Sequence, residues 1–540
     1  MKKNVFWIVL TLILSSCGGG GSSSGSGSNS SGASYASLAA QCAAPRPAGT
    51  VDPVSHQAYN DTQGTLTTEM AWIASYVSST YLWYADVPVV SSAPYQINAT
   101  VNYVNPSNNR QSTKVLANNY DVVDAYFNSQ RSPLTTASGK PKDQFHFTYP
   151  TSVWDSLSAS GIETGFGFQV ALIAASPPRV NYVAYTSPGT TAAQNNVQRG
   201  AQFISVNGVD VANGSDLATL NEGLFAPIAG KQYTFVVLDQ GSTVPRTITM
   251  TASNVSLTPV MNVGTLPAPN AAVGYMLFND HLATAESELI AAVNKLNAAN
   301  NGTGIRDLVL DIRYNGGGYL AIASELAYMI AGAPATAGKT FEQETFNNKN
   351  PFPSDTAATP FYSQTVGLSA AAGQALPQLG LSTVYVITTG STCSASEAVI
   401  NGLRGIGVRV VQIGSTTCGK PYGFLPQDNC STTYFTIQFE GVNNAGFGAY
   451  ADGFIPGGSG SAANNLPGCV VADDFTKQLG DPSEANLAAA LQFRANGTCP
   501  AAPTASSKWM ARFMQGESAL KRSPARENRI LRRIPQASAI

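Results

Sequence analysis

The chain has 540 residues, more than a single hydrophobic core accommodates, so two to four domains are expected. Its net charge is −2 and only 11% of its residues are charged, which excludes a field strong enough to attract nucleic acid or another polyanion. Gly, Ser, Thr and Asn fill most polar positions, a composition compatible with export.

The first residues have the pattern of an export signal. Residues 1–3 carry positive charge, and the apolar run of residues 5–14 is too short to span a bilayer as a permanent helix. Leu14-Ser15-Ser16-Cys17 is similar to the lipobox of bacterial lipoproteins, in which the cysteine is acylated. An ordinary signal peptide is the alternative. Residues 1–17 are the predicted signal peptide and lipobox, and the Gly/Ser-rich residues 18–34 a flexible tether.

Two amphipathic helices are predicted within residues 35–155. Apolar side chains recur at helical spacing in residues 66–84 and again in residues 120–127. In the first segment the recurring residues are Met70, Ile73, Val77 and Tyr81. Residues 35–155 are therefore expected to form a small helical N-terminal domain.

A series of short strands is predicted from Gly165 to about Leu257. Within it, residues 197–211 closely resemble part of a PDZ domain, and Asn207-Gly208 supplies a hairpin turn because both residues tolerate positive φ. The loop Gly165-Phe166-Gly167-Phe168 occupies the position at which PDZ domains bind a peptide carboxylate. A strand start without a ligand is the alternative. We expect a PDZ-like domain over residues 156–262.

The next region alternates apolar strands with helices. Residues 274–278 and 307–313 are predicted strands, and residues 283–296 and 319–330 predicted helices. Asn315-Gly316-Gly317-Gly318 lies between the second strand and the second helix, a layout typical of an anion-binding turn. Residues 339–362 show no periodicity and are predicted to be a long loop.

A serine then lies at the start of a helix. Residues 384–387 are a predicted strand, Ser394 follows, and residues 398–400 begin a helix whose unpaired amides favour an anionic nucleophile or oxyanion. The next strand, residues 408–413, leads to Gly419-Lys420, so Ser394 and Lys420 are expected at neighbouring strand ends. Beyond them we predict a strand over residues 432–439, a helix over residues 481–494 and a loosely ordered basic tail after Pro503.

These motifs resemble those of the C-terminal processing peptidases, also called tail-specific proteases. The resemblance is carried by Thr392-Cys393-Ser394-Ala395-Ser396-Glu397, by Gly419-Lys420 and by the glycine turn. Residues 143–147 and 452–457 also resemble short family segments, and the likeness extends from about Leu66 to about Cys499. It implies a multidomain α/β protein with a crotonase-like, mixed-sheet peptidase core over residues 263–475. Residues 476–540 would be a C-terminal helix and basic tail.

The resemblance implies a serine endopeptidase with a lysine base. Ser394 would be the nucleophile and Lys420 the general base, since a lysine acts as a base only if burial lowers its pKa enough to leave it neutral. The amide of Ala395 and one from Gly316 or Gly317 would form the oxyanion hole. Ser396 is the rival nucleophile, and a plain helix cap is the structural alternative for Ser394.

Two departures from the family pattern concern the lysine. The interval from Ser394 to Lys420 is one residue longer than in the family, and Phe424 stands where many members have a glutamine that orients the lysine. Glu397 or Gln427 is the candidate for a third catalytic group.

Two other functions stay open at this point. His281 follows a predicted strand, and a Ser/His enzyme would need such a residue near Ser394. A non-catalytic lipoprotein of the same fold that binds peptides or small apolar molecules is the alternative from a different class.

Six cysteines remain when Cys17 is set aside, which makes disulfides plausible in an exported chain. Spacing suggests the pairs Cys418 with Cys430 and Cys469 with Cys499. Cys393 is a rival partner for Cys418, because the nucleophile and the lysine must meet. No metal-ligand spacing is present, and we expect no metal and no cofactor.

The expected partners follow from the same resemblance. Substrates would be exported proteins or peptides with free C-termini, presented by the PDZ-like domain, and the enzyme would be held to a membrane by a lipid anchor. The expected location is the bacterial cell envelope, on the periplasmic side of the outer membrane. Nucleic acid is not expected as a partner.

Overall fold

The computed structural model describes residues 34–52, 57–104, 111–351, 358–457, 462–501 and 531–532. The predicted signal peptide, Cys17 and nearly all of the predicted tether lie outside these residues. Most of the basic tail lies outside them as well. Within the described ranges, no helix combines the length and the apolar character that crossing a membrane requires.

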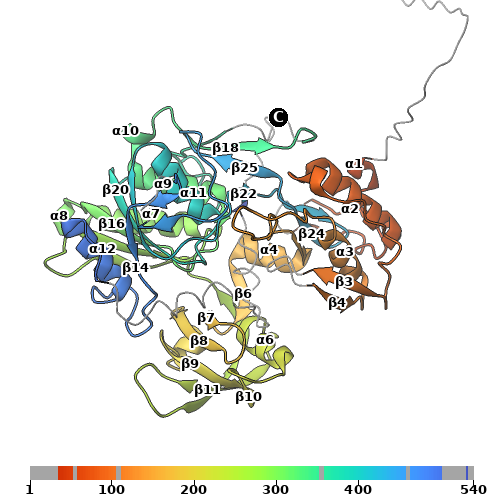
Figure 1. The fold of residues 1–540 in the computed structure, drawn as a ribbon, viewed down its shortest axis with the longest axis horizontal. Helices are drawn as coiled ribbons and strands as arrows, with labels where there is room; N and C mark the ends of the chain where they lie inside the picture. Colours follow the sequence, from red (N-terminus) through yellow and green to blue (C-terminus); the bar gives the residue numbers. More distant parts are fainter. Residues whose placement is uncertain are drawn as a thin grey trace, which may run out of the picture. The chain divides into compact units, whose positions relative to one another are not determined.

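A six-stranded sheet underlies the predicted peptidase core (Figure 1). In spatial order its strands are β14 Val260–Thr265, β15 Val273–Phe278, β16 Asp307–Asp311, β20 Thr383–Thr388, β21 Arg409–Gly414 and β28 Gly468–Val470. β14 is antiparallel to β15, and all other neighbours are parallel. The parallel crossovers contain α7 Ala285–Asn297, α9 Leu320–Ala331 and α11 Ala395–Gly405. The predicted mixed-sheet α/β core is confirmed.

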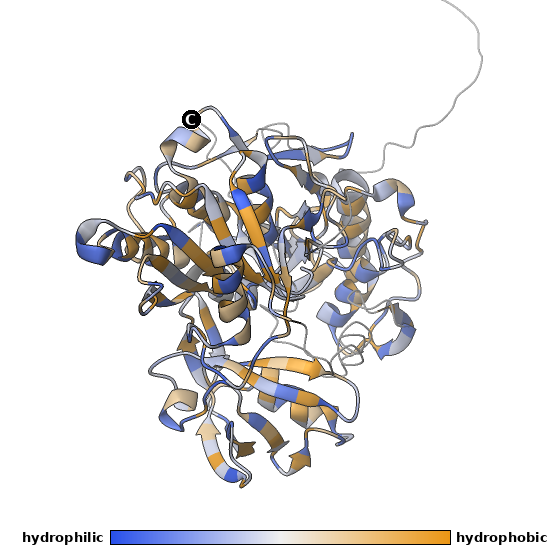
Figure 2. Ribbon diagram, turned by 60° about the vertical axis from the view of Figure 1, so that its left-hand side comes forward, coloured by the Kyte–Doolittle hydropathy of each residue, from blue (hydrophilic) through white to orange (hydrophobic). Residues whose placement is uncertain are grey.

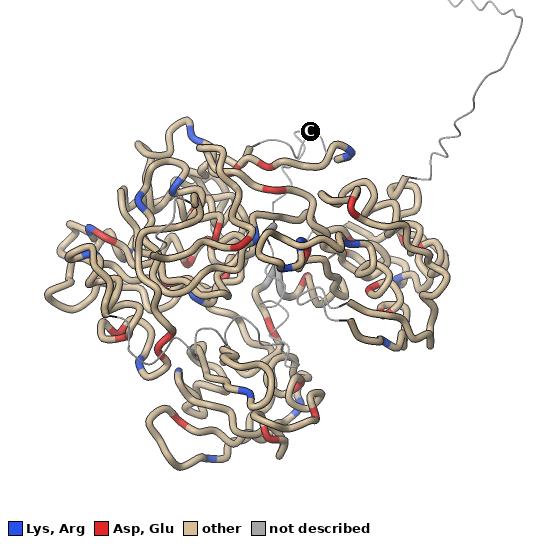
Figure 3. The backbone as a smooth tube through the Cα atoms, in the orientation of Figure 1, with Lys and Arg blue, Asp and Glu red and all other residues tan. Residues whose placement is uncertain are grey.

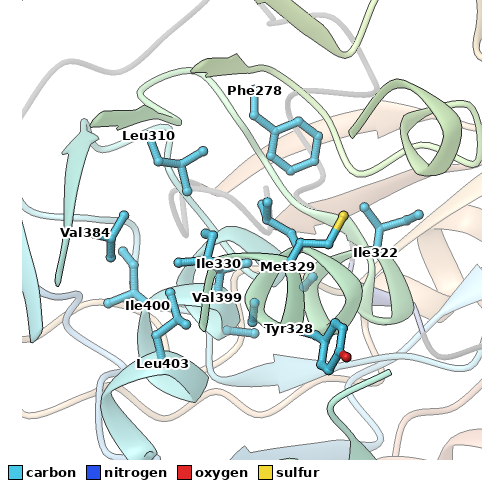
Figure 4. Packing of buried hydrophobic residues seen from close by; sticks show 14 of the residues in the cluster. Phe278, Leu310, Ile322, Tyr328, Met329, Ile330, Val384, Val399, Ile400 and Leu403 are labelled. Carbon is cyan, nitrogen blue, oxygen red and sulfur yellow. The ribbon is translucent and has the colours of Figure 1, made fainter. Parts of the chain in front are cut away.

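The central strands are buried on both faces, so they read as continuous apolar runs. Figure 2 shows hydrophobic residues concentrated along the central strands. On one face Leu310 and Val384 pack under α9 and α11, where Met329 and Ile400 cover them (Figure 4). On the other face, strand residues such as Val309 pack in a second cluster with Leu487 and its neighbours in α12 Ala485–Asn496. This packing fixes the strand ends at which the candidate site lies.

The N-terminal region contains both predicted helices, as α2 Leu66–Thr80 and α3 Asn119–Asn128. It also contains strands, and these join it to the distant core sequence. β5 Phe147–Pro150 pairs antiparallel with β24 Thr432–Phe435, and β24 pairs with β23 Gln427–Asn429. Side chains from the segment after Lys420 thus lie in the same hydrophobic cluster as the N-terminal helices.

The region around residues 162–256 contains the expected short strands. Its four-stranded sheet has the order β10 Val209–Asp210, β9 Gln202–Val206, β11 Gln232–Leu238 and β12 Arg246–Thr251. Asn207 at φ 48° and Gly208 at φ 82° form the turn between β9 and β10. A hairpin of β7 Phe168–Ala174 and β8 Val180–Thr186 and the helix α6 Leu217–Phe225 complete it.

Two predictions of secondary structure were wrong. The predicted loop at residues 339–362 contains the strand β18 Thr340–Phe346, and the predicted strand at residues 432–439 is divided into β24 and β25 Phe439–Val442. β18 and β25 pair with each other. The alternation in β18 is hidden because the inward positions include Glu342 and Glu344, which are buried.

Three disulfides tie distant segments together. Cys42 is bonded to Cys430, Cys393 to Cys418, and Cys469 to Cys499. The pairing of Cys469 with Cys499 is confirmed, whereas that of Cys418 with Cys430 was wrong and the rival pairing with Cys393 is correct. Spacing failed for Cys430 because its partner lies 388 residues away, beside a strand pairing that brings the two ends together.

Charged residues are sparse along the chain (Figure 3), yet five of them form one buried cluster. Arg313 at the end of β16 binds Asp311 (2.8 Å), Asp473 (2.7 Å) and Glu484 (3.0 Å). Arg199, from the PDZ-like region, also binds Asp473 (2.6 Å). The cluster therefore joins the PDZ-like region to the segment that leads into the glycine turn.

Candidate active site

Ser394 lies between β20 and α11, as the sequence predicts, in a backbone conformation that non-glycine residues rarely adopt. Its φ is 61° and its ψ is −118°. Such strain persists only where the surroundings enforce it, and it is common at catalytic residues. The side chain is buried, and its Oγ has no hydrogen-bond partner among the described residues. No described group therefore engages the hydroxyl.

Glu397 holds the serine loop and the lysine loop together. Its Oε2 accepts hydrogen bonds from the backbone N–H of Ser394 (2.9 Å) and of Lys420 (2.8 Å). Its Oε1 accepts from the N–H of Gly419 (2.9 Å) and from Thr417 Oγ1 (2.5 Å). Burial raises the pKa of Glu397, and these hydrogen bonds act in the opposite direction. With four donors around it, the carboxylate positions two backbone segments.

Lys420 is fully buried, and two aromatic rings line its ammonium group. The Nζ atom lies 3.9 Å from the ring centroid of Phe424 and 4.7 Å from that of Phe145. Phe424 is the residue at which the sequence departs from the family's glutamine. An aromatic ring, that of Phe424, thus contacts the Lys420 amine at this position.

The two loops are also joined covalently and by the backbone. The disulfide between Cys393 and Cys418 bridges Cα atoms 5.2 Å apart, and the N–H of Cys418 donates to Thr392 O (3.0 Å). β20 and β21 are adjacent parallel strands, which brings both loops to the same sheet edge. Ser394 and Lys420 thus follow neighbouring strand ends, as expected.

The glycine turn packs directly against Ser394. A Cβ atom added to Gly317, whose φ is 104°, would lie 2.8 Å from Ser394 Cβ, so only glycine fits. The N–H of Gly317 donates to Asn315 Oδ1 (3.0 Å), while Asn315 O accepts from Cys393 N–H (3.1 Å). Asn315 therefore fixes the turn to the serine loop. Its role was missed, because an asparagine before three glycines also suits an ordinary turn.

The amides available to an oxyanion follow from these contacts. Ala395 is the first residue of α11, where amides have no intrahelical partner. Since the Gly317 amide is engaged by Asn315, Gly316 is the better candidate of the two predicted glycines. Ser396, the rival nucleophile, donates its hydroxyl to Asn315 O (3.1 Å) and is less available than Ser394.

His281 lies beside the glycine turn. Its Nδ1 contacts Asn315 Oδ1 at 3.0 Å, and because that oxygen accepts only, Nδ1 carries the proton. Burial lowers the pKa of His281 to about 3, so the ring is neutral at physiological pH. Nε2 has no hydrogen-bond partner among the described residues, and neither has Ser394 Oγ, so the two are not hydrogen-bonded to each other.

The other predicted residues lie in two places. Gln427 begins β23, where it pairs with Tyr434, and its side-chain amide is 3.4 Å from Asp428 O. The loop Gly165-Phe166-Gly167-Phe168 lines a small cavity together with Leu224 and Phe225 at the end of α6. Cys393, Glu397 and Cys418 are close enough to hold a metal ion, but their two sulfurs are bonded to each other.

Comparison with known proteins points to one family. Residues 272–428 match the model of Peptidase family S41. A carboxyl-terminal-processing protease of Picosynechococcus sp. is 29% identical over 274 residues, which are 49% of this chain and 56% of that protein. The chain is thus similar to carboxyl-terminal-processing proteases, and residues 272–428 to Peptidase family S41. A second carboxyl-terminal-processing protease, from Synechocystis sp., is 27% identical over 176 residues, 32% of this chain and 38% of that protein.

The S41 segment contains the whole serine, lysine and glycine-turn constellation. Residues 272–428 run from the start of β15 into β23 and include Gly317, Ser394 and Lys420. The fold extends further, because an S41 protease from Bacteroides fragilis superposes with a TM-score of 0.55 at 21% identity, over 79% of this chain and 97% of that one. The chain spans about half the length of the curated relatives it matches.

Proposed function

We propose that this protein is a serine endopeptidase that cleaves exported proteins near their C-termini, with Ser394 as nucleophile and Lys420 as general base. One observation carries the proposal. Glu397 accepts hydrogen bonds from the backbone amides of both residues, at 2.9 Å and 2.8 Å, beside a Ser394 hydroxyl that has no other described partner. This arrangement holds a free hydroxyl and a buried amine on adjoining loops.

The reaction would proceed by acyl transfer. Neutral Lys420 takes the proton from Ser394 Oγ as that oxygen attacks the peptide carbonyl. The carbonyl oxygen becomes an oxyanion, and the amides of Ala395 and Gly316 donate to it. Lys420 then gives the proton to the leaving amine as the C–N bond breaks. A water molecule, deprotonated by the same lysine, hydrolyses the acyl ester and restores Ser394.

The surroundings of Lys420 favour the neutral amine that this reaction needs. Taking an ammonium group out of water costs several kcal/mol even after the protein relaxes. Contact with an aromatic face stabilises a desolvated cation by about 2 kcal/mol or more, and the rings of Phe424 and Phe145 therefore offset part of this cost. Lys420 is completely inaccessible, so its ammonium form would lose its hydration.

The PDZ-like region would capture the substrate. The loop Gly165 to Phe168 and α6 enclose a small apolar cavity suited to the last side chain of a peptide, with backbone amides for its carboxylate. A larger cavity of about 1010 Å³ lies between β7 and the segment from Thr389 to Ser391, just before Ser394. A captured chain would have room there to approach the nucleophile.

Export and anchoring are proposed from the sequence. Residues 1–17 carry the signal and lipobox pattern, so Cys17 would be acylated and the enzyme held in the bacterial cell envelope, facing the periplasm from the outer membrane. Three disulfides among the described residues fit an oxidising compartment.

The test is cleavage of a peptide that ends in a free carboxylate and an apolar residue, followed by mass spectrometry of the products. Ser394→Ala and Lys420→Ala should each lose at least about 10³-fold in rate, and the double variant should be no worse, because the two residues act as one unit. Ser396→Ala is the matched control and should retain most activity. Activity that survives Ser394→Ala but not Ser396→Ala would contradict the assignment.

A further inference from the structure

A short strand from the last part of the chain lies at the candidate active site. β29 Leu531–Arg532 pairs in parallel with β17 Gly318–Tyr319, with Leu531 beside Gly318. Gly318 directly follows Gly317, the glycine that abuts Ser394. The pairing therefore brings a second stretch of backbone to the turn that would line the oxyanion hole.

The edge of β17 that receives β29 is the one turned away from His281. On the His281 side, His281 N–H donates to Gly317 O (3.1 Å) and Tyr319 N–H donates to His281 O (2.9 Å). In extended backbone the groups of alternate residues point to opposite sides, so the N–H and C=O of Gly318 face toward β29. An unpaired strand edge of this kind is where peptides add to a sheet.

The same segment also reaches the lysine side of the site. Cα atoms of β29 lie within 8 Å of Cα atoms of β22 Tyr422–Gly423. β22 begins two residues after Lys420 and pairs on another side with β25. β29 therefore contacts both the element that follows Gly317 and the element that follows Lys420, and a substrate extended along these two elements would pass close to both loops.

We propose that Leu531–Arg532 occupies the strand position of the substrate and inhibits the enzyme from within the same chain. The inference rests on the proposed function of Ser394 and Lys420. It also gives the direction of binding, since a substrate that takes this place runs parallel to β17. Recognition through backbone hydrogen bonds suits an enzyme that accepts different sequences.

The size of the effect follows from effective concentration. A segment of the same polypeptide is present at its site at about 1 mM. For a free segment with a Kd of about 100 µM, this effective concentration gives an occupancy that lowers kcat/KM about tenfold.

The first test uses the full chain with Leu531→Pro and Arg532→Pro, which removes two N–H groups and prevents strand pairing. Its kcat/KM for a free-acid peptide should rise about tenfold over the parent. Ala537→Pro places a proline in the same tail outside the pair and should leave the rate unchanged. Equal rates for all three proteins would overturn the proposal.

The second test does not depend on catalysis. A fluorescent peptide of residues 526–540 should bind the full chain that carries Ser394→Ala together with both prolines, and should bind the Ser394→Ala chain with an intact tail about tenfold more weakly. A scrambled peptide should bind neither. If the peptide binds as expected but none of the protein variants cleaves a substrate, the proposed peptidase function is wrong, whereas binding of the tail at β17 is supported. If cleavage occurs and the peptide does not bind, the inhibition proposal fails alone.

Discussion

The backbone geometry of the candidate site depends on two residues, Glu397 and Ser394. The carboxylate of Glu397 contacts no group expected to change charge in the reaction, yet it accepts from both loop amides at 2.8–2.9 Å. Ser394 meanwhile holds a positive φ of 61°. We therefore expect Glu397 to act as a positioning residue, so that its loss affects the proposed catalysis through backbone geometry.

Glu397→Gln should lower kcat by at least about tenfold, because an amide can turn only one accepting oxygen toward four donors. KM should change little, since no substrate contact is removed. The matched control is Glu288→Gln in α7, where a half-buried carboxylate also accepts from a backbone amide, that of Val260 (2.8 Å). Steady-state kinetics give kcat and KM of both variants and the parent. Equal kcat for Glu397→Gln and the parent would contradict the positioning role.

The pH profile distinguishes a lysine base from a histidine base. Since only a neutral lysine accepts a proton, log kcat/KM should rise with pH up to a plateau. His281, whose pKa is lowered by burial to about 3, changes charge only far below this range. His281→Gln should therefore leave the midpoint of the rise where it is, even if the rate falls. Disappearance of the midpoint in His281→Gln, with Lys420→Ala still active, would identify a Ser/His enzyme.

At the scale of elements, the ends of β20 and β21 are held together by the disulfide of Cys393 and Cys418. Cys393 directly precedes Ser394, and Cys418 lies two residues before Lys420. Replacing both cysteines by alanine should lower kcat by about tenfold or more, because the two loops are then joined only by hydrogen bonds. The double alanine variant of Cys469 and Cys499, a pair at β28 and beyond α12, is the control.

The control variant should lose stability, about 2–4 kcal/mol for a disulfide of this loop size, while kcat of the folded enzyme stays the same. Thermal unfolding and kinetics on both double variants separate the two effects. Unchanged kcat after removal of the bond between Cys393 and Cys418 would show that the hydrogen bonds of Glu397 suffice.

A second prediction at this scale concerns how the predicted PDZ-like region recognises the C-terminus of a substrate. Amidation of a substrate's C-terminus should raise KM if the loop from Gly165 to Phe168 binds the carboxylate through its backbone amides, as proposed. Phe168→Glu should abolish the preference for the free acid, and Val244→Glu, an exposed site in the same region, should preserve it. Equal cleavage of free and amidated peptides by the parent enzyme would contradict capture by this loop and leave the Ser394 chemistry untouched.

At the scale of the whole molecule, the buried charge cluster links the PDZ-like region with the core. Burial alone would raise the pKa of Asp473, but Arg313 and Arg199 lower it below its ordinary value. Its contribution to stability is therefore complete above about pH 4, the ordinary Asp pKa, and is lost as the pH falls through the lowered folded-state pKa. Arg313→Met should cost about 3–5 kcal/mol, since three buried acids lose their common partner; chemical unfolding measures it.

The sequence predicted the elements that are locally determined. Continuous apolar runs, separated by glycine-rich turns, predicted β15, β16, β20, α9 and α11. The positions of Ser394 and Lys420 after successive predicted strands indicated that both residues lie at adjacent strand ends. β18 was missed because buried Glu342 and Glu344 interrupt its apolar alternation. The partner of Cys430 and the pairing of β5 with β24 were missed because contacts across hundreds of residues leave no local pattern. Asn315 was missed because its role exists only in three dimensions.

The proposed nucleophile is tested most directly by identifying the residue that a covalent serine-protease inhibitor modifies. The purified protein would be treated with a peptidyl phosphonate that forms a stable ester with an activated serine, then digested and analysed by mass spectrometry. We predict a single modified residue, Ser394, and a rate of modification that falls by at least about 10³-fold in Lys420→Ala. Modification of Ser396, or of Ser394 at an unchanged rate in Lys420→Ala, would contradict this prediction.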